Sequence, residues 1–205
     1  MKGVLVCIEG IDGAGKHTQA ELLAKALREK GIESKIYTYP DYDSDYGKMI
    51  DRYLNGHLKL NVDELILLHL ADKVKDGTDI KKQIDKGIVV ITDRYYYSTI
   101  AYQCAGGFDY ERAKDLVDLM NSNAPDVIFY LDIPIEIVAD RKSKQKGFID
   151  KNERNTNYQR DVKGVYERML KEGYSSKWVK IDGTLPVQEV HKKMLDTLSK
   201  NGISV

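Results

Sequence analysis

The chain has little of several features that mark other classes of protein. It has only 2 cysteines in 205 residues, too few for a disulfide scaffold, and Cys7 and Cys104 lack metal-ligand spacing. No apolar run approaches the roughly 18 residues of a membrane-spanning helix. The short apolar stretch near the N-terminus is interrupted by Glu9 and has no small-residue cleavage site, which argues against a signal peptide. We therefore expect a cytoplasmic protein with no membrane partner.

The chain also has no excess of charge of either sign. Lys plus Arg and Asp plus Glu each number 32, so the net charge is zero, whereas general nucleic-acid binders are strongly basic. With 42% hydrophobic and 31% charged residues, the composition is that of a globular protein. There is no repeat, low-complexity tract or linker. We expect a single domain, residues 1–205, without a nucleic-acid partner.

What the chain does contain is a series of short apolar runs that alternate with helical periods. Such runs predict strands over residues 4–8, 35–39, 88–91, 127–131 and 178–181. Apolar residues spaced three and four apart predict a helix from Thr18 to near Gly31 and others around 65–72, 113–120 and 187–198. This alternation is typical of a parallel sheet covered on both faces. Ligands of such sheets bind beyond the carboxyl ends of the strands.

The first predicted strand is followed by a glycine-rich loop and a helix. The loop fits the pattern Gly-x-x-x-x-Gly-Lys in its required context, with the residues Gly10, Ile11, Asp12, Gly13, Ala14, Gly15 and Lys16. The glycines let backbone N–H groups point at phosphate oxygens, and the lysine brings positive charge to the β and γ phosphates. A turn that only packs a helix on a sheet would not explain Lys16. We predict a nucleotide-phosphate site that extends to His17 and Thr18.

One position of this loop departs from the pattern. The pattern has Ser or Thr after the lysine, because that hydroxyl binds Mg²⁺, and here the residue is His17. A neutral imidazole is a poor ligand for a hard cation that prefers oxygen. We therefore expect Asp12, the phosphates and water to hold magnesium, and His17 to pack against the phosphate end or to contact a substrate.

A second candidate phosphate site follows the third predicted strand. Asp93, Arg94 and Tyr95 stand at the end of that strand, and Ser98 to Gln103 continue at helical spacing. An arginine at this edge of the sheet suits bidentate capture of a phosphate. The alternative is a surface Asp–Arg pair, which contributes little. Two facing phosphate sites are what phosphoryl transfer between nucleotides requires.

These motifs together resemble the thymidylate kinases, a family of nucleoside monophosphate kinases. The resemblance covers nearly the whole chain. It is carried by the phosphate loop, by Asp93-Arg94-Tyr95 with Ser98, Ala101, Tyr102 and Gln103, and by residues 39–40, 47–48, 153–154 and 165–167. It implies an α/β P-loop NTPase fold of three layers, with a five-stranded parallel sheet flanked by helices and a mobile lid. It also implies a homodimer and phosphoryl transfer from ATP to dTMP.

Carried over position by position, the resemblance implies roles for particular residues. Arg94 would hold the acceptor phosphate, and Asp12 would lie near the acceptor sugar and the magnesium. Tyr42 resembles a tyrosine that crowds the sugar 2′ position, and Glu167 matches an acidic residue near the metal. The implied acceptor pocket also contains Ser98, Thr99, Tyr102 and Gln103.

The base pocket departs from the family pattern. The family has phenylalanine and arginine where this chain has His69 and Lys73. An imidazole can stack and an ammonium can donate to a carbonyl oxygen, but lysine lacks the rigid fork of arginine. A family arginine after the second strand is also missing, and Asp41 and Tyr42 stand there. His69 as an ordinary core histidine is the alternative.

Residues 141–160 are expected to cover the nucleotide as a basic lid. Seven of these residues are basic and two are acidic, which suits neutralisation of the transferring phosphoryl group. The phosphate loop has Gly13 where some members have arginine, so the resemblance implies that the key arginine lies in the lid. Arg154 is the first candidate for this arginine and Arg160 is the second. Arg141 resembles the residue that flanks adenine. A solvated charged loop is the alternative.

The sequence thus predicts phosphorylation of dTMP to dTDP by in-line transfer, with ATP and Mg²⁺ as cofactors. The predicted catalytic residues are Asp12, Lys16, Arg94 and Arg154. An acceptor phosphate is already ionised, so no general base is needed. The alternatives are a kinase for another nucleoside monophosphate such as dUMP, a nucleoside kinase with Glu9 as its base, and a nucleotide-binding homologue that does not catalyse.

Overall fold

The computed structural model of the chain describes residues 3–120, 123–138 and 156–202. Five parallel strands form one sheet in the order β2-β3-β1-β4-β5. The strands are β1 (Leu5–Glu9), β2 (Ser34–Thr38), β3 (Val89–Asp93), β4 (Val127–Asp132) and β5 (Trp178–Asp182). The predicted five-stranded parallel sheet is therefore confirmed.

Burial along the strands follows their place in the sheet. The central strands β1 and β3 are buried at every position, and β4 is buried at all but its last residue, because helices cover both of their faces. The edge strands β2 and β5 keep partly exposed residues. The most apolar runs of the sequence therefore form the middle of the sheet, which is the core of the molecule.

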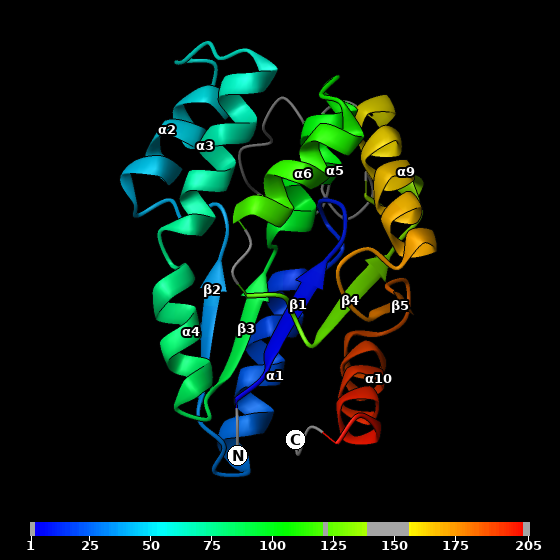
Figure 1. Cartoon of the computed structure of the whole chain (residues 1–205). Helices are drawn as coiled ribbons and strands as arrows, with labels where there is room; N and C mark the ends of the chain where they lie inside the picture. The colour runs from blue at the N-terminus through cyan, green and yellow to red at the C-terminus, as the bar shows by residue number, and fades with distance from the viewer. Residues whose placement is uncertain (1–2, 121–122, 139–155, 203–205) are drawn as a thin grey trace.

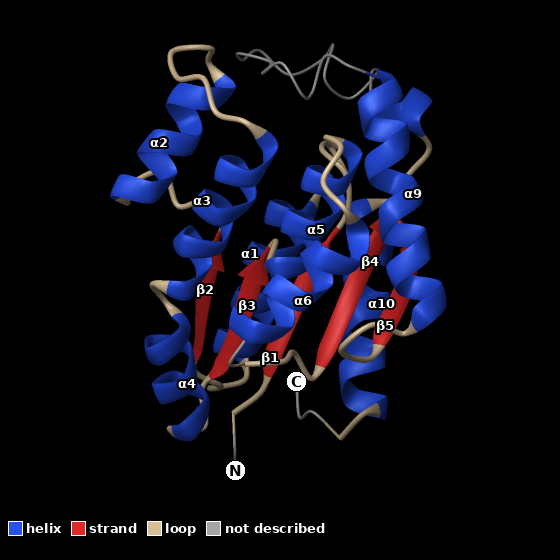
Figure 2. Ribbon diagram, turned by 45° about the horizontal axis from the view of Figure 1, so that its top comes forward, coloured by secondary structure: helices blue, strands red, loops and turns tan. Residues whose placement is uncertain are grey.

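The helices lie in two layers on opposite faces of the sheet, as Figures 1 and 2 show. Helix α1 packs against α10 on one face, while α5 packs against α9 and α3 on the other. Right-handed crossovers between parallel strands require this division. The described helices are α1 (Lys16–Glu29), α2 (Asp45–Leu54), α3 (Val62–Val74), α4 (Gly77–Asp85), α5 (Tyr96–Ala105), α6 (Tyr110–Met120), α9 (Thr156–Glu172) and α10 (Val187–Lys200).

Three differences from the predicted boundaries bear on the site. Helix α1 begins at Lys16, two residues before Thr18, because the left-handed backbone of Gly15 (φ 89°) turns the chain directly into the helix. The first strand, predicted over residues 4–8, continues through Glu9, which is its last residue and is fully buried. Residues 156–160 of the predicted lid form the start of α9 and not a loop, and residues 141–155 lie outside the described residues.

The strand register gathers the loops that carry the candidate site. Ile8 of β1 and Thr38 of β2 both pair with Asp93 of β3, so these three strands end side by side. Helices α2 and α3 lie beyond the end of β2, at the upper left of Figure 1. The phosphate loop, the loop after β2 and the Asp93-Arg94 turn therefore meet at one edge of the sheet.

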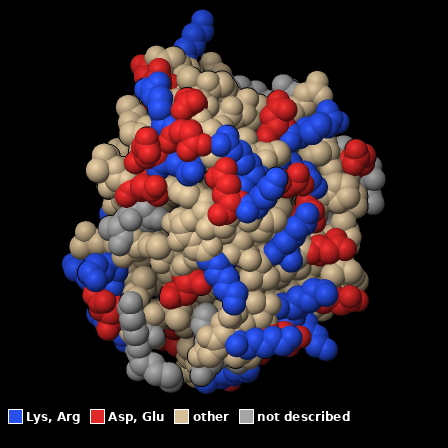
Figure 3. Space-filling model, turned by 45° about the vertical axis from the view of Figure 1, so that its right-hand side comes forward, with Lys and Arg blue, Asp and Glu red and all other residues tan. Residues whose placement is uncertain are grey.

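The surface carries charges of both signs. On the face drawn in Figure 3, Lys and Arg side chains lie among Asp and Glu side chains, in keeping with a net charge of zero. Within the described part of the chain, no helix is long and apolar enough to cross a membrane.

Candidate active site

The phosphate loop lies between β1 and α1, with its lysine folded back across it. Gly13 and Gly15 have φ angles of 75° and 89°, which favour glycine. The Nζ atom of Lys16 donates to the carbonyl oxygen of Ile11 at 2.8 Å, and the side chain is buried. Burial, with a further contribution from the charge of Arg94, lowers the pKa of Lys16 to about 8. An anion beside this ammonium would favour its charged form.

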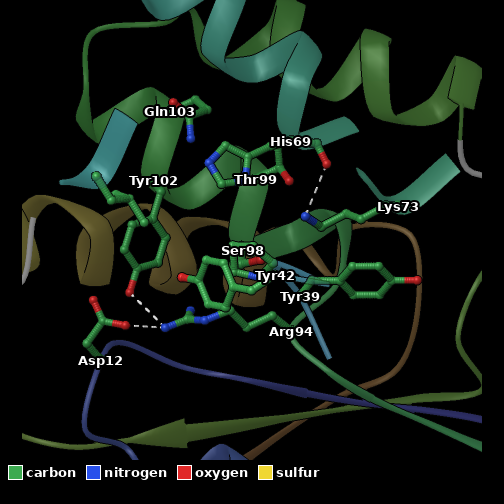
Figure 4. A pocket seen from close by; sticks show the side chains of 12 residues that line it. Asp12, Tyr39, Tyr42, His69, Lys73, Arg94, Ser98, Thr99, Tyr102 and Gln103 are labelled. Atoms are coloured by element: carbon green, nitrogen blue, oxygen red, sulfur yellow. Dashed lines mark hydrogen bonds and ion pairs between the residues drawn. The ribbon is translucent and has the colours of Figure 1, made fainter. Parts of the chain in front are cut away.

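Arg94 spans from the end of β3 to the phosphate loop. Its Nη1 donates to the carbonyl oxygen of Gly10 at 3.1 Å, and its Nη2 forms an ion pair with Asp12. Nη2 also donates to the hydroxyl of Tyr102 at 3.2 Å, and the guanidinium lies over that ring, 5.0 Å from its centre. The backbone of Arg94 is left-handed (φ 66°), which is uncommon outside glycine and occurs at functional sites. Figure 4 shows this cluster at one end of a cavity.

The cavity next to Arg94 has a volume of about 150 Å³. It gathers side chains from the phosphate loop, the loop after β2, and helices α2, α3 and α5. Its lining consists of Asp12, Tyr39, Pro40, Tyr42, Leu54, His69, Lys73, Arg94, Ser98, Thr99, Tyr102 and Gln103. Its position beyond the carboxyl ends of the strands is where sheets of this kind bind ligands.

His69 and Lys73 lie one turn apart on α3 and form the wall of the cavity opposite Asp12 (Figure 4). Lys73 is 1% exposed, its Nζ donates to the carbonyl oxygen of His69 at 3.2 Å, and it lies 5.2 Å from the centre of the Tyr39 ring. Burial lowers the pKa of Lys73 to about 8. Burial and the charge of Lys73 hold the pKa of His69 well below its usual range, so His69 is neutral. The wall thus offers a neutral ring beside an ammonium group.

The sequence matches the family model described as thymidylate kinase over residues 8–194. The chain belongs to the thymidylate kinase family. It is 32% identical to the thymidylate kinase of Fervidobacterium nodosum, over 94% of this chain and 96% of that protein. It is 28% identical to the thymidylate kinase of Plasmodium falciparum, over 97% and 91% of the two chains. The solved structure of thymidylate kinase from Candida albicans matches it with a TM-score of 0.80 and 26% identity, over 98% of this chain and 93% of that one.

Membership of the thymidylate kinase family confirms the predicted fold and enzyme class. The protein is a nucleoside monophosphate kinase that uses ATP. The structure brings together all nine side chains predicted to bind the acceptor, namely Asp12, Tyr42, His69, Lys73, Arg94, Ser98, Thr99, Tyr102 and Gln103. Their individual roles remain predictions.

Other predicted residues are not gathered around the cavity. Glu167 is exposed on α9, where its charge acts on Lys180 and Tyr130, and it is not among the residues that line the cavity. Arg160 is exposed, and its Nη1 donates to Asn157 at 2.8 Å. Thr18 is exposed on α1. The predicted roles of Arg141 and Arg154 fall outside the described residues.

Glu9 has a structural environment that the sequence did not reveal. Its side chain is 0% exposed, and its Oε1 accepts the backbone N–H groups of Tyr95 at 2.7 Å and Ser98 at 3.3 Å. Its Oε2 accepts the hydroxyl of Tyr166 at 2.7 Å. Burial raises the pKa of Glu9. The carboxylate therefore anchors the start of α5 and does not line the cavity, so it is not the base that a nucleoside kinase would need.

Asp72 and Gln159 are two further residues whose part in the site was not predicted. Gln159 of α9 donates from Nε2 to Oδ2 of Asp12 at 3.0 Å, which fixes the second oxygen of that carboxylate. Asp72 is fully buried and accepts from the backbone N–H of Asp41 and the hydroxyl of Ser44, both at 3.2 Å. It thus ties the loop that carries Tyr42 to α3. The sequence did contain one signal for Asp72, because this charged residue stands among the apolar positions of the helix predicted around 65–72.

Proposed function

We propose that the protein transfers the γ-phosphoryl group of ATP to the 5′-phosphate of dTMP. One observation carries the proposal: the guanidinium of Arg94 joins the phosphate loop, through Gly10 and Asp12, to a cavity lined by every predicted acceptor residue. The phosphate loop and Lys16 would hold the donor phosphates on one side of Arg94. The acceptor phosphate would bind to Arg94 from the other side.

Positioning and charge are expected to do most of the catalysis. The acceptor phosphate is already ionised, so in-line attack on the γ phosphate needs no general base. Lys16 and Arg94 stabilise the charge on the transferring group, and Asp12 orients Arg94 through their ion pair. Arg154, then Arg160, are the proposed lid arginines, and Arg141 is proposed to flank adenine.

The acceptor base is proposed to lie between Tyr102, Gln103 and the wall formed by His69 and Lys73. The neutral ring of His69 can stack on a pyrimidine, and Lys73 can donate to a carbonyl oxygen. Tyr42, half exposed at the mouth of the cavity, is placed to contact the sugar.

A divalent cation is expected to accompany ATP. The protein could supply only some of the ligands of such a cation, because no three His, Cys, Asp or Glu side chains gather as a metal site among the described residues. Most ligands would come from the phosphates and water, as Mg²⁺ favours. Asp12 of the phosphate loop is the proposed protein ligand, and its two carboxylate oxygens contact Arg94 and Gln159 in this structure. When bound, the cation would neutralise charge on the β and γ phosphates.

The protein is also proposed to act in the cytoplasm as a homodimer. Helix α3 contacts both α2 and α6, and these three helices carry large exposed apolar side chains, namely Tyr46, Met49, Leu67, Val74, Leu119 and Met120. Burial of such side chains against a second copy would stabilise the dimer.

A coupled ADP-release assay with Mg-ATP tests the proposed function. The acceptors are dTMP, dUMP, dCMP, dAMP, dGMP, thymidine and the ribose monophosphates. We expect the highest kcat/KM with dTMP and no turnover with thymidine. A panel is needed because the Candida albicans enzyme is described as having broad substrate specificity. A higher kcat/KM with another monophosphate would identify that nucleotide as the preferred acceptor in place of dTMP. ATP binding without ADP release for any acceptor would contradict kinase activity.

A further inference from the structure

One ammonium group joins three carboxylates beside the acceptor cavity. It belongs to Lys75, which directly follows α3. Its Nζ lies 3.1 Å from Oδ2 of Asp41, 3.3 Å from Oδ1 of Asp72 and 2.6 Å from Oδ2 of Asp76. Asp41 lies in the loop after β2, Asp72 in α3, and Asp76 directly before α4. Lys75 therefore connects the loop after β2 to the helices that follow it.

This ion-pair cluster is shielded from water and is charged at neutral pH. The side chain of Lys75 is 19% exposed and that of Asp72 is fully buried. Partial burial by itself would lower the pKa of Lys75, but hydrogen bonds with Asp76 and Asp41 outweigh it, so the pKa lies above its usual value. Burial would raise the pKa of Asp41, but its contacts with Lys75 hold that pKa below the usual value. Ion pairs that water reaches poorly are weakly screened by salt.

The cluster holds a loop that forms part of the cavity. Tyr39 and Tyr42, both in residues 39–44, line the cavity (Figure 4). The hydroxyl of Tyr39 donates to Oδ2 of Asp76 at 3.0 Å, and its ring centre lies 5.1 Å from Nζ of Lys75. Lys75 itself is not among the residues that line the cavity. Its effect on a ligand there would therefore pass through the loop.

The remaining contacts between this loop and α3 depend on Asp72. That carboxylate accepts the backbone N–H of Asp41 and the hydroxyl of Ser44, and among the described residues its ion-pair partner is Lys75. A buried carboxylate that loses its charged partner is strongly destabilised. Without the ammonium, the carboxylates of Asp41, Asp72 and Asp76 would also repel one another. The loop would then move away from α3.

We propose that Lys75 is a positioning residue for the acceptor, because it holds residues 39–44 where Tyr39 and Tyr42 form one side of the cavity. The inference deepens the proposed function and rests on it, since the cavity is taken to be the acceptor site. Lys75 acts on the loop and does not touch the acceptor. Its loss should therefore weaken acceptor binding more than it slows phosphoryl transfer.

Hydrogen–deuterium exchange of the backbone amides tests the position of the loop without turnover. In Lys75→Met, which keeps the side-chain stem, residues 39–44 should exchange about tenfold faster, the scale of losing a hydrogen bond to a charged group. Lys75→Arg should restore slow exchange, because a guanidinium can still donate to these carboxylates. Lys35→Met is the matched control, because Lys35 of β2 pairs with Asp79 of α4 at 2.6 Å and does not contact the loop. Natural exchange rates in Lys75→Met would overturn the proposal.

Steady-state kinetics at saturating ATP give the second readout. In Lys75→Met, KM for the acceptor should rise about tenfold while kcat changes little, because the loop binds the ground state and the transition state alike. Lys75→Arg should restore KM, and Lys35→Met should leave both constants unchanged. A fall in kcat with unchanged KM in Lys75→Met would overturn the proposal, as would a KM that Lys75→Arg does not restore.

A milder variant keeps the test valid if Lys75→Met does not fold. Asp41→Asn removes the charge that faces Lys75 and keeps the oxygen that accepts the backbone N–H of Asp43 at 3.2 Å. Exchange of residues 39–44 should rise about threefold, the scale of a partly exposed ion pair. Unchanged exchange would overturn the proposal.

The proposal and the proposed function fail separately. If another monophosphate is the preferred acceptor, its KM replaces that of dTMP in the kinetic test, and the exchange measurement is unaffected. Phosphorylation of dTMP with natural exchange rates and natural KM in Lys75→Met would contradict only the role of Lys75.

Discussion

Three contacts hold the guanidinium of Arg94 in place before any phosphate arrives. Its Nη1 donates to the carbonyl of Gly10, and its Nη2 contacts both the carboxylate of Asp12 and the hydroxyl of Tyr102. Arginine can keep such contacts and still present N–H groups to a phosphate, because its five donors lie in a rigid plane. A lysine has one compact ammonium group and cannot do both.

Arg94→Lys should therefore lower kcat/KM for dTMP by about 100-fold, the scale of losing one positioned charge donor. Steady-state kinetics at saturating ATP measure this loss. Arg28→Lys, an exposed change near the end of α1, is the matched control and should be neutral. A value for Arg94→Lys within about threefold of the natural chain would contradict the assigned role.

Lys73 should make acceptor binding depend on pH. Burial lowers its pKa to about 8, so the ammonium is present below that pH and is lost as the pH rises through it. At saturating ATP, kcat/KM for dTMP should fall between about pH 7 and about pH 9. Lys16 has a similar pKa, but bound ATP phosphates would keep it charged.

Lys73→Arg keeps a positive charge across this range, so its profile should be flat where that of the natural chain falls. The measurement is kcat/KM for dTMP against pH for both proteins. An identical fall in the two proteins would assign the titration to another group. Circular dichroism at each pH separates a kinetic effect from unfolding.

At the scale of elements, the loop after β2 is held by the start of α2 and by α3. Ser44 caps α2 by accepting the backbone N–H of Gly47 at 3.0 Å, and its hydroxyl shares its one hydrogen between the carbonyl oxygen of Asp41 at 2.7 Å and Oδ1 of Asp72 at 3.2 Å. A Cβ on Gly47 would clash with the backbone carbonyl of Asp41. Glycine at this position thus lets α2 approach the loop that carries Tyr42.

Gly47→Ala and Gly164→Ala should change stability in opposite directions. The first forces backbone atoms apart and should lower the free energy of unfolding by about 1–3 kcal/mol. The second adds a methyl group in open space on α9 and should raise it by about 0.5–1 kcal/mol, through the higher helix propensity of alanine. Urea denaturation measures both. If both substitutions changed the free energy of unfolding by the same amount and in the same direction, the close approach at Gly47 would be contradicted.

Much of this element-scale arrangement could not be predicted from the sequence. The strands, the phosphate loop and α5 have strong local signals, namely apolar runs, glycine spacing and the Asp-Arg-Tyr turn. The helices α2 and α4 were not predicted from apolar periodicity. Helix α9 was not predicted either, and its first residues were assigned to the lid, although α9 packs on α5. The start of α1 was placed wrongly because the local backbone of Gly15 determines it.

At the scale of the whole molecule, the proposed dimer makes a separate prediction. Leu67 and Leu119 are 54% and 77% exposed on α3 and α6. The double variant Leu67→Glu, Leu119→Glu would bring charges into the proposed interface and should be monomeric by light scattering after size exclusion. Val187→Glu changes a similarly exposed residue on α10 and should remain dimeric. A monomeric natural chain would contradict the dimer.

The sequence by itself determined the family, the parallel sheet and the residue types that meet phosphate, because these depend on local patterns of glycine, charge and apolar runs. Only the tertiary structure decided what each group faces. It placed the carboxylate of Glu9 inside the core against α5, held Asp12 between Arg94 and Gln159, and paired His17 with Asp93. These partners lie far apart in the chain, and they meet because parallel strands end at one edge of the sheet.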